Sequence, residues 1–481
     1  MLSPVAMADI GGGGSTLPAK AYQGSSAVVP VSGPRLSTPL PGSLFYEALP
    51  AVTQSYCQTG SGAGRSIMVG SSGNTDASRS CPASFSDDFF NGISGFSAPS
   101  SDADFAASDA PASLVDFDAF IRNKGVHEQL VQFPALAGSI TVIARSQTKG
   151  WPTHLTEAEL CNIFSGKITN WNQLVDINGR PFHDMPITIV YRSDNSGTSF
   201  SFSNHLNKVC QDASLAQKLS PVASPLPFPS GSNFTVQSLF ANAFPGGVVP
   251  AHALAASGNA GMLATVSATD GTIGYAETAY LRDPVPVTLI RISPFDPASE
   301  LDPTDGVVRS RRGWYIKSYT ASHQFQIPST FTDVDGSVLS GTYTGRALSA
   351  NDSRYGRPVG VPTALTATQA PHPNCVFLVH PGAYATSAYN TAGSPSSGYK
   401  SYPIIAISYL LGNFALNGNA NDMASLIGSP YNVALRVGNG GPVTSIWDNT
   451  GYYYLTAPVV AATLTGSALT LNQARVDACV N

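Results

Sequence analysis

Three short polar loops in this sequence combine small residues with hydroxyl groups directly before a segment that we expect to be helical. They are residues 13–18 (GGSTLP), 60–64 (GSGAG) and 192–199 (RSDNSGTS). Free N–H groups at a helix N-terminus bind anions, glycine lets the backbone approach a ligand closely, and Ser and Thr hydroxyls add donors. Arg192 would add a charged fork that suits an oxyanion. Each loop alone is a common turn, but together they predict an oxyanion site.

A carboxylate in the apolar segment 104–111 (DFAASDAP) narrows the choice of anion. An ionised carboxylate only accepts hydrogen bonds, so Asp109 beside an anion requires a ligand that carries a proton. Phosphate near neutral pH has such a P–OH group, whereas sulfate has none and would meet a desolvated like charge. The alternative interpretation of Asp109 alone is a turn or a helix cap. Taken with the three loops, Asp109 favours phosphate.

Composition and motif patterns exclude several other classes of function. Only 11% of the 481 residues are charged and the net charge is −5, so the basic surface that binds nucleic acid is missing. No apolar run reaches the ~18–20 residues of a membrane-spanning helix. The histidines form no H-E-x-x-H pattern and the cysteines form no C-x-x-C pair, so we predict neither a metal site nor a cofactor.

The cysteines and the N-terminus predict export. An even number of widely spaced cysteines is typical of disulfides in an oxidising compartment, and the alternative is a set of buried free thiols. Proximity favours the pairs Cys57–Cys81 and Cys161–Cys210, which leaves Cys375–Cys479. The A-x-A pattern at residues 6–8 predicts that residues 1–8 are the tail of a trimmed signal peptide. We therefore expect a periplasmic or secreted protein.

The segments that must position the polar loops alternate between strand and helix patterns. A short strand is predicted from Ile10, and the segment 402–416 resembles a buried strand that runs into a helix. Further strands are predicted at 131–137, 140–144, 187–191 and 273–275, and helices at 155–164 with Thr156 as cap, 200–206 and 254–266. This alternation is typical of an α/β fold. Polar loop insertions are predicted at 24–43, 65–100 and 284–400.

Five segments in order resemble the high-affinity phosphate-binding proteins of ABC uptake systems. They are 104–113 (DFAASDAPAS), 130–135 (LVQFPA), 160–171 (LCNIFSGKITNW), 191–200 (YRSDNSGTSF) and 271–280 (GTIGYAETAY). The start at residues 9–14 (DIGGGG) is similar to the DING branch of that family. The resemblance implies a two-lobed periplasmic-binding-protein fold of type II with a hinge, here with long loop insertions. Lobe I would comprise residues 9–133 and 284–481, and lobe II residues 134–283.

The resemblance also implies which residues contact the anion. On lobe I these are Thr16, the backbone of Leu17, Ser61 and Asp109. On lobe II they are Arg192, Ser196, Gly197 and Thr198, with Asp194 holding the arginine. Cys161 and Cys210 match a disulfide of the DING branch. The chain departs from the family pattern at Asn195, where the family has glycine, and in the long spacing between Ser61 and Asp109.

The predicted function is therefore extracytoplasmic capture of inorganic phosphate without catalysis. The resemblance implies an ABC permease as the partner of the loaded protein. An alternative is an extracellular structural protein that self-associates into a filament or surface layer on the same fold, which the low charge and the Ser/Gly/Pro-rich loops would suit. A third interpretation is a weak phosphatase that uses the same cleft, although the sequence offers no obvious nucleophile–base pair.

Overall fold

The computed structural model describes residues 10–24, 36–69, 104–112, 116–117, 119–120, 123, 130–145, 154–175, 180–211, 233–281, 287–293, 375–379, 381–385, 404–414, 420–446, 452–455, 459–463 and 468–480. The predicted signal-peptide tail, Cys81 and most of the predicted insertions lie outside these residues. For the residues outside the described ranges the interpretation stays a prediction. Where the predicted insertions are described, the assignment to loops was wrong at residues 36–37, 288–293 and 377–378, which pair as strands, and at 65–68 and 381–384, which are helical.

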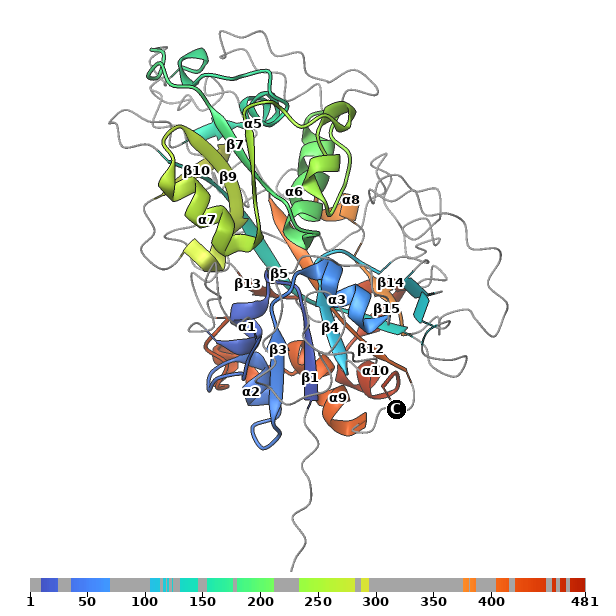
Figure 1. The fold of residues 1–481 in the computed structure, drawn as a ribbon. Helices are drawn as coiled ribbons and strands as arrows, with labels where there is room; N and C mark the ends of the chain where they lie inside the picture. Colours follow the sequence, from blue (N-terminus) through green and yellow to red (C-terminus); the bar gives the residue numbers. More distant parts are fainter. Residues whose placement is uncertain are drawn as a thin grey trace, which may run out of the picture.

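In the described part of the chain, a 12-stranded mixed sheet forms the centre of the fold (Figure 1). Its strands are β1 (Ile10–Gly14), β2 (Leu36–Ser37), β3 (Gln54–Cys57), β4 (Phe105–Ser108), β5 (Leu130–Ala144), β6 (His154–Thr156), β7 (Thr188–Arg192), β8 (Ala253–Ala256), β9 (Thr272–Glu277), β10 (Thr288–Ser293), β12 (Ile405–Asn413) and β13 (Tyr452–Tyr454). The main order is β2-β3-β1-β4-β12-β5-β9-β7-β8, and β6, β10 and β13 pair beside it. A separate small sheet contains β11 (Phe377–Leu378), β14 (Val459–Thr463) and β15 (Ala468–Leu471).

The two ends of the large sheet are each built around parallel strands. β1 pairs in parallel with β3 and β4, and β7 pairs in parallel with β8 and β9. We call the part with β1, β2, β3, β4 and β12 the β1 half, and the part with β6, β7, β8, β9 and β10 the β7 half. Carboxyl ends of parallel strands meet at one edge, where open α/β sheets bind their ligands. All three polar loops of the sequence follow such carboxyl ends.

Strand β5 belongs to both halves. Residues 130–139 of this strand pair with β12, and residues 140–144 pair with β9. All 15 of its residues are buried, which is typical of a strand covered on both faces. The predicted strands at 131–137 and 140–144 are thus confirmed as one element. The predicted lobe boundary between residues 133 and 134 falls inside it, and the division into lobes stays a prediction.

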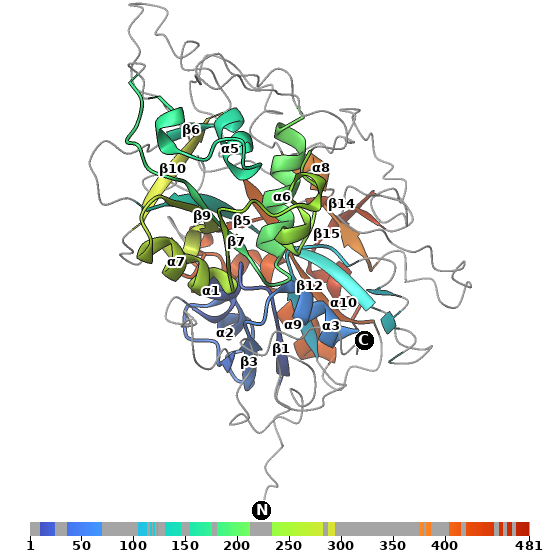
Figure 2. The ribbon, with the colours of Figure 1, turned by 45° about the horizontal axis from the view of Figure 1, so that its top comes forward.

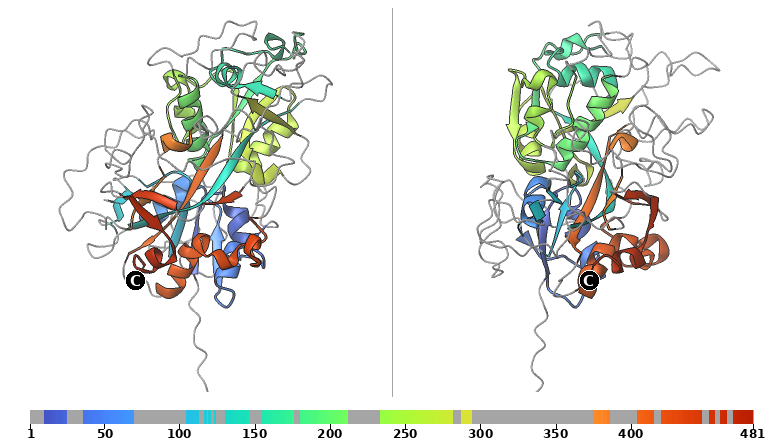
Figure 3. Two further views of the ribbon diagram at one scale, coloured as in Figure 1. Left: turned by 180° about the vertical axis from the view of Figure 1, so that it is seen from behind. Right: turned by 90° about the vertical axis from the view of Figure 1, so that its right-hand side faces the viewer.

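Helices cover both halves of the sheet. They are α1 (Ala19–Gln23), α2 (Leu44–Ala48), α3 (Ser61–Met68), α5 (Glu157–Phe164), α6 (Gly197–Val209), α7 (Gly258–Ala268), α8 (Pro381–Tyr384), α9 (Ala420–Gly428) and α10 (Gln473–Asp477). The early helices α1, α2 and α3 lie with the β1 half, whereas α5, α6 and α7 lie with the β7 half (Figure 2). Helices α9 and α10, in orange and red, return to the β1 half (Figure 3).

The helix predicted over 155–164 is confirmed from its third residue onward. Thr156 caps α5 through a capping box: its Oγ1 accepts from the N–H of Glu159 at 3.2 Å, and its own N–H donates to the Glu159 carboxylate at 2.8 Å. The helix predicted over 200–206 begins earlier, at Gly197, because the Ser196 hydroxyl caps it by accepting from the N–H of Ser199 at 3.3 Å.

Two predicted boundaries were wrong. The helix predicted over 254–266 begins at Gly258, since residues 253–256 form β8 and pair with β7; this pairing overrides the helix propensity of an Ala/Leu run. The strand predicted within 402–416 is β12, but no helix follows it as far as residue 414. The next helix in the described chain is α9, which begins at Ala420.

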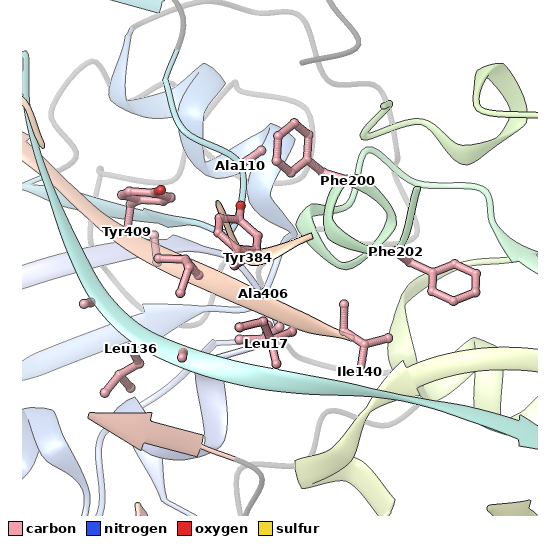
Figure 4. Packing of buried hydrophobic residues seen from close by; sticks show 14 of the residues in the cluster. Leu17, Ala110, Leu136, Ile140, Phe200, Phe202, Tyr384, Ala406 and Tyr409 are labelled. Carbon is pink, nitrogen blue, oxygen red and sulfur yellow. The ribbon is translucent and has the colours of Figure 1, made fainter. Parts of the chain in front are cut away.

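Buried apolar side chains also fix the loop after β1 against the shared strand. Leu17, from the loop after β1, lies beside Ile140 of β5 and near Ala406 of β12 (Figure 4). A Cβ at Gly138 would lie 2.6 Å from Cδ2 of Leu17, so only glycine lets this loop pack so closely on β5. The first polar loop is thereby fixed against the strand that both halves share.

Disulfides tie down both ends of the fold. The predicted bonds Cys161–Cys210 and Cys375–Cys479 are confirmed. Cys57 is also disulfide-bonded, while its predicted partner Cys81 lies outside the described residues. Within the described ranges, no cysteine is free and no helix is long and apolar enough to cross a membrane.

A candidate anion-binding site

The N-termini of α3 and α6 meet between the two halves of the sheet (Figure 1). The hydroxyl of Ser61, the first residue of α3, accepts hydrogen bonds from the backbone N–H groups of Asp109 at 3.0 Å and of Gly197 at 3.2 Å. The N–H of Gly62 donates to the carbonyl of Asn195 at 3.1 Å. Two helix N-termini, each the positive end of a helix dipole, therefore face one small region.

This approach depends on glycine at two positions. A Cβ at Gly197 would lie 2.4 Å from Cβ of Asp109 and 2.5 Å from Oγ of Ser61. A Cβ at Gly62 would lie 2.5 Å from Cγ of Asn195. Any larger residue at either position would push the two helix ends apart, so the glycines let the halves close on each other.

Asp109 follows β4 and is 1% exposed. Its Oδ2 accepts hydrogen bonds from the hydroxyls of Ser15 and Ser61, the latter at 3.3 Å. Its Oδ1 is buried and has no hydrogen-bond partner. Burial raises the pKa of this carboxyl to about 6, and the hydroxyls of Ser15, Ser408 and Ser61 and the positive charge of Arg192 oppose the shift in part. Asp109 is therefore a buried acceptor with an oxygen to spare, beside two helix N-termini.

Arg192 ends β7 and is completely buried. Its Nε and Nη2 donate to the two carboxylate oxygens of Asp194 at 2.7 and 2.6 Å, and the N–H of Gly258 at the start of α7 donates to the same carboxylate at 2.8 Å. Burial favours a lower pKa for the guanidinium, but the charge of Asp194 outweighs it and the pKa is raised. The bidentate pair fixes Nη1, which lies 3.4 Å from Oγ1 of Thr198 and 3.3 Å from Oδ1 of Asn259.

Direct hydrogen bonds join the loop after β1 to the β7 half. Nδ2 of Asn259 donates to Oγ1 of Thr16 at 2.9 Å, and the hydroxyl of Tyr280 donates to the Thr16 carbonyl at 3.1 Å. The N–H of Leu17 donates to the Ser15 hydroxyl at 3.1 Å, and this hydroxyl in turn donates to Asp109. The loop after β1 therefore connects both sides of the site.

The end of β9 contributes another buried carboxylate. Glu277 is 1% exposed, and its Oε1 accepts a hydrogen bond from the Thr198 hydroxyl and lies 3.8 Å from Nη1 of Arg192. Its Oε2 is buried without a hydrogen-bond partner. Burial raises the pKa of this carboxyl to about 7, although Arg192 and Thr198 act in the opposite direction. Glu277 is thus poised between its charged and neutral forms near neutral pH.

The structure brings the residues predicted from the sequence into one region. The side chain of Ser196 caps α6, and its N–H donates to the carbonyl of Ser238 at 2.9 Å. Asp194 pairs with the arginine as the resemblance implied. Whether these residues bind an anion stays a prediction. The full set is Thr16, Leu17, Ser61, Asp109, Arg192, Ser196, Gly197 and Thr198, with Asp194 in support.

Three residues of this region were missed in the sequence. Ser15 lies inside the first polar loop but was not singled out as the partner of Asp109. Glu277 lies in a quoted segment, and a lone carboxylate at the end of a buried strand pattern was a signal that could have found it. Asn259 had no comparable signal, because its role depends on α7 starting at Gly258. In the described residues, no group of three or more His, Cys, Asp or Glu side chains could hold a metal ion.

Two parallel-stranded halves that share a strand and face each other across polar loops define the periplasmic-binding-protein fold. A sequence profile described as a PBP superfamily domain matches residues 21–295, which is more than half of the chain. The chain therefore belongs to the PBP superfamily, and its predicted resemblance to phosphate-binding proteins is confirmed.

Solved structures agree on the fold. An ancestral soluble variant of the human phosphate binding protein matches with a TM-score of 0.52 and 19% identity, over 98% of this chain and 93% of that one. A high-affinity periplasmic phosphate-binding protein, PfluDING, bound with phosphate, matches with a TM-score of 0.51 and 19% identity, over 98% and 92%. At such identities the likeness shows the fold alone.

Two relatives illustrate the sequence similarity. Alkaline phosphatase L of Pseudomonas aeruginosa is 29% identical over 276 residues, which are 57% of this chain and 57% of that protein. The phosphate-binding protein PstS of Xylella fastidiosa is 34% identical over 181 residues, 37% of this chain and 41% of that protein. The chain thus spans about half the length of the curated relatives it matches.

Proposed function

We propose that this chain binds inorganic phosphate between its β1 half and its β7 half and catalyses no reaction. Hydroxyl groups of Thr16 and Thr198, N–H groups at the starts of α3 and α6, and the Arg192 guanidinium would donate to the phosphate oxygens. Asp109 would accept the proton of the P–OH group. Relatives that are named phosphate-binding proteins support this choice of ligand.

The observation that carries the proposal is the surroundings of Asp109. This carboxylate is buried with a spare oxygen, between two helix N-termini that favour negative charge. An acceptor among anion donors suits only an anion that brings its own proton. Monohydrogen phosphate does so, and sulfate at neutral pH does not, so the same carboxylate that attracts one repels the other.

The related proteins also bear on the alternatives. Several relatives are named for phosphate binding, and the alternative of a self-assembling structural protein finds no support in them. Three relatives from Pseudomonas aeruginosa are named alkaline phosphatase L, so hydrolysis of a phosphate ester should be measured beside binding. Export to the periplasm or the medium and delivery of phosphate to an ABC permease complete the proposal. The predicted lobes are residues 9–133 with 284–481 and residues 134–283, but β10 pairs with β5 and β6 and therefore belongs with the second lobe.

Isothermal titration tests the proposal. Phosphate is titrated into exhaustively dialysed protein at pH 7.5, sulfate serves as the matched anion, and p-nitrophenyl phosphate turnover is followed in parallel. We expect one phosphate per chain with no heat from sulfate and no turnover. Absence of phosphate binding would overturn the proposal, and turnover that disappears in Arg192→Ala would replace it with the phosphatase interpretation.

A further inference from the structure

The hydroxyl of Thr198 has a single proton, and phosphate would not be its only acceptor. A threonine hydroxyl donates one hydrogen bond and accepts up to two. Its Oγ1 contacts Oε1 of Glu277 and lies 3.4 Å from Nη1 of Arg192, which can only donate. An ionised Glu277 must therefore take the Thr198 proton, and the hydroxyl then has nothing to donate to an anion.

Protonation of Glu277 reverses this hydrogen bond. A neutral carboxyl donates its own O–H to Oγ1 of Thr198, and Arg192 donates to the same oxygen. The proton of Thr198 then points away from both groups and becomes available to a ligand. The same protonation removes one negative charge from a buried region into which an anion must fit.

We propose that Glu277 is a positioning residue that carries a proton when phosphate is bound, and that its neutral form turns the Thr198 hydroxyl toward the anion. The inference rests on the proposed function, because it assigns the donor state of the same site. One proton is taken up in this step, and Glu277 receives it from solvent. Asp109 stays ionised and accepts the hydrogen bond of the P–OH group.

The environment of Glu277 favours this neutral form. The side chain is buried, Oε2 has no partner, and burial raises the pKa to about 7. The negative charge of Asp109 raises the pKa as well, whereas Arg192 lowers it. Tyr452 of β13, which interacts with Glu277, is itself neutral, because burial raises its pKa well above the ordinary value. The charged and titratable groups around Glu277 come from several elements. They are Arg192 at the end of β7 and Asp194 after it, Asp109 after β4, Tyr452 from β13, Tyr275 from β9, and Tyr280 with Lys20, whose Nζ lies 5.3 Å from the Tyr280 ring centroid.

The test compares phosphate affinity of the wild type with that of Glu277→Gln at several pH values by isothermal titration. Glutamine is neutral at every pH, and its amide can donate to Thr198 as a protonated glutamate does. We expect equal affinities within about two-fold at pH 6, and tighter binding by Glu277→Gln of roughly ten-fold or more at pH 8.5, where a carboxyl with a pKa near 7 is mostly ionised. The ratio of the two affinities cancels the ionisation of phosphate itself.

A second pair of variants isolates the hydroxyl. In Thr198→Val the side chain keeps its shape but has no proton to reorient, so adding Glu277→Gln to it should change the affinity at pH 8.5 much less than in the wild-type background. Circular dichroism and thermal unfolding of each variant show that it is folded. An equal effect in both backgrounds would overturn the reorientation, since Glu277 would then act through its charge alone.

The remaining outcomes separate this inference from the proposed function. If the ratio of the phosphate affinities of Glu277→Gln and the wild type is the same at pH 6 and pH 8.5, Glu277 is a structural partner of Arg192. This result would overturn the inference, while phosphate binding stands. Failure of the wild type to bind phosphate at any pH would overturn the proposed function itself. If this affinity ratio rises with pH and the rise requires the Thr198 hydroxyl, the result would support both the inference and the proposed function.

Discussion

Two buried carboxylates on opposite sides of the candidate site, Asp109 and Asp194, are held in different ways. On the β1 half, Asp109 is met by the hydroxyls of Ser15 and Ser61 and has one oxygen without a partner. On the β7 half, Asp194 is held by a bidentate bond from Arg192, and both of its oxygens have partners. Asp109 on the β1 half thus has a carboxylate oxygen that can still accept a hydrogen bond, and Arg192 on the β7 half is a cation in a fixed position.

This difference shows that net positive charge is not what would draw an anion here. Around the site the described residues include three buried cations, Arg192, Lys20 and Arg65, against three buried carboxylates, those of Asp109, Asp194 and Glu277. Attraction must come from oriented N–H groups, hydroxyls and helix dipoles, which cannot dissociate and are already aligned. The carboxylates then decide which anion is accepted, and in which protonation state.

Removal of the Arg192 guanidinium should remove the difference between the two sides and have the largest effect on phosphate affinity. Arg192→Ala leaves Asp194 and Glu277 buried without their partner, and we expect it to weaken phosphate binding at least thirty-fold, since loss of one member of a buried charge pair is worth about 2–5 kcal/mol. Titration calorimetry measures this, with the exposed Arg180→Ala as control. Wild-type affinity in Arg192→Ala would place the end of β7 outside the site.

The second prediction concerns the two carboxylates with raised pKa values. Because the pKa values of Asp109 (about 6) and Glu277 (about 7) exceed those of the unfolded chain, the folded protein binds more protons between about pH 4 and 7. Their contribution to the free energy of unfolding is complete below about pH 4 and is lost as the pH rises through 6–7. Each ten-fold difference in proton affinity between the folded and unfolded chain is worth about 1.4 kcal/mol.

Denaturant unfolding of phosphate-free protein at pH 5 and pH 8 measures this loss. The combined variant Asp109→Asn and Glu277→Gln should lose less stability over that interval than the wild type, by a few kcal/mol. Identical losses in both proteins would mean that neither carboxyl has a raised pKa.

The Asp109 carboxylate on the β1 half can be replaced with little change in the shape of the side chain. Asp109→Asn replaces an acceptor-only group by an amide that also donates, so sulfate should be tolerated better and phosphate less well. We expect the ratio of sulfate to phosphate dissociation constants to fall about ten-fold, as for loss of a charge-assisted hydrogen bond. Competition titration measures the ratio, with the exposed Asp477→Asn as the matched carboxylate control. An unchanged ratio would remove Asp109 from its proposed role.

The smallest predicted effect lies away from both sides of the site. Thr156→Ala removes the capping box of α5 and should reduce the free energy of unfolding by about 1 kcal/mol. Phosphate affinity should stay within error of the wild type, which would show that lost stability alone does not weaken binding. A parallel loss of affinity would argue that the other variants act through folding.

The α/β class, the disulfides Cys161–Cys210 and Cys375–Cys479, and the polar loops that the structure brings together could be predicted from the sequence, whereas the residues that bind the anion stay a prediction. Hydroxyls and glycines before a helix pattern have a physical role wherever the chain goes, so the loops 13–18, 60–64 and 192–199 could be recognised. Asp109 was informative because a carboxylate among anion donors contradicts their chemistry unless the ligand carries a proton.

The remaining features of the fold and the site could not be predicted from the sequence, because they depend on contacts between distant segments. Residues 253–256 form a strand only because β7 lies beside them, and Asn259 reaches Thr16 only because α7 then starts at Gly258. The role of Glu277 required knowing that the end of β9 meets the start of α6. Periodicity carries no information about such pairings.

The strand that both halves share has a mechanical consequence. β5 passes from its pairing with β12 to its pairing with β9 without a break, and the hydroxyls of Ser139 and Thr141 both bond Thr278 at this point. We therefore expect any separation of the two halves to bend or untwist this hydrogen-bonded strand, and its pairing is irregular beside Pro134, where we expect bending to be easiest.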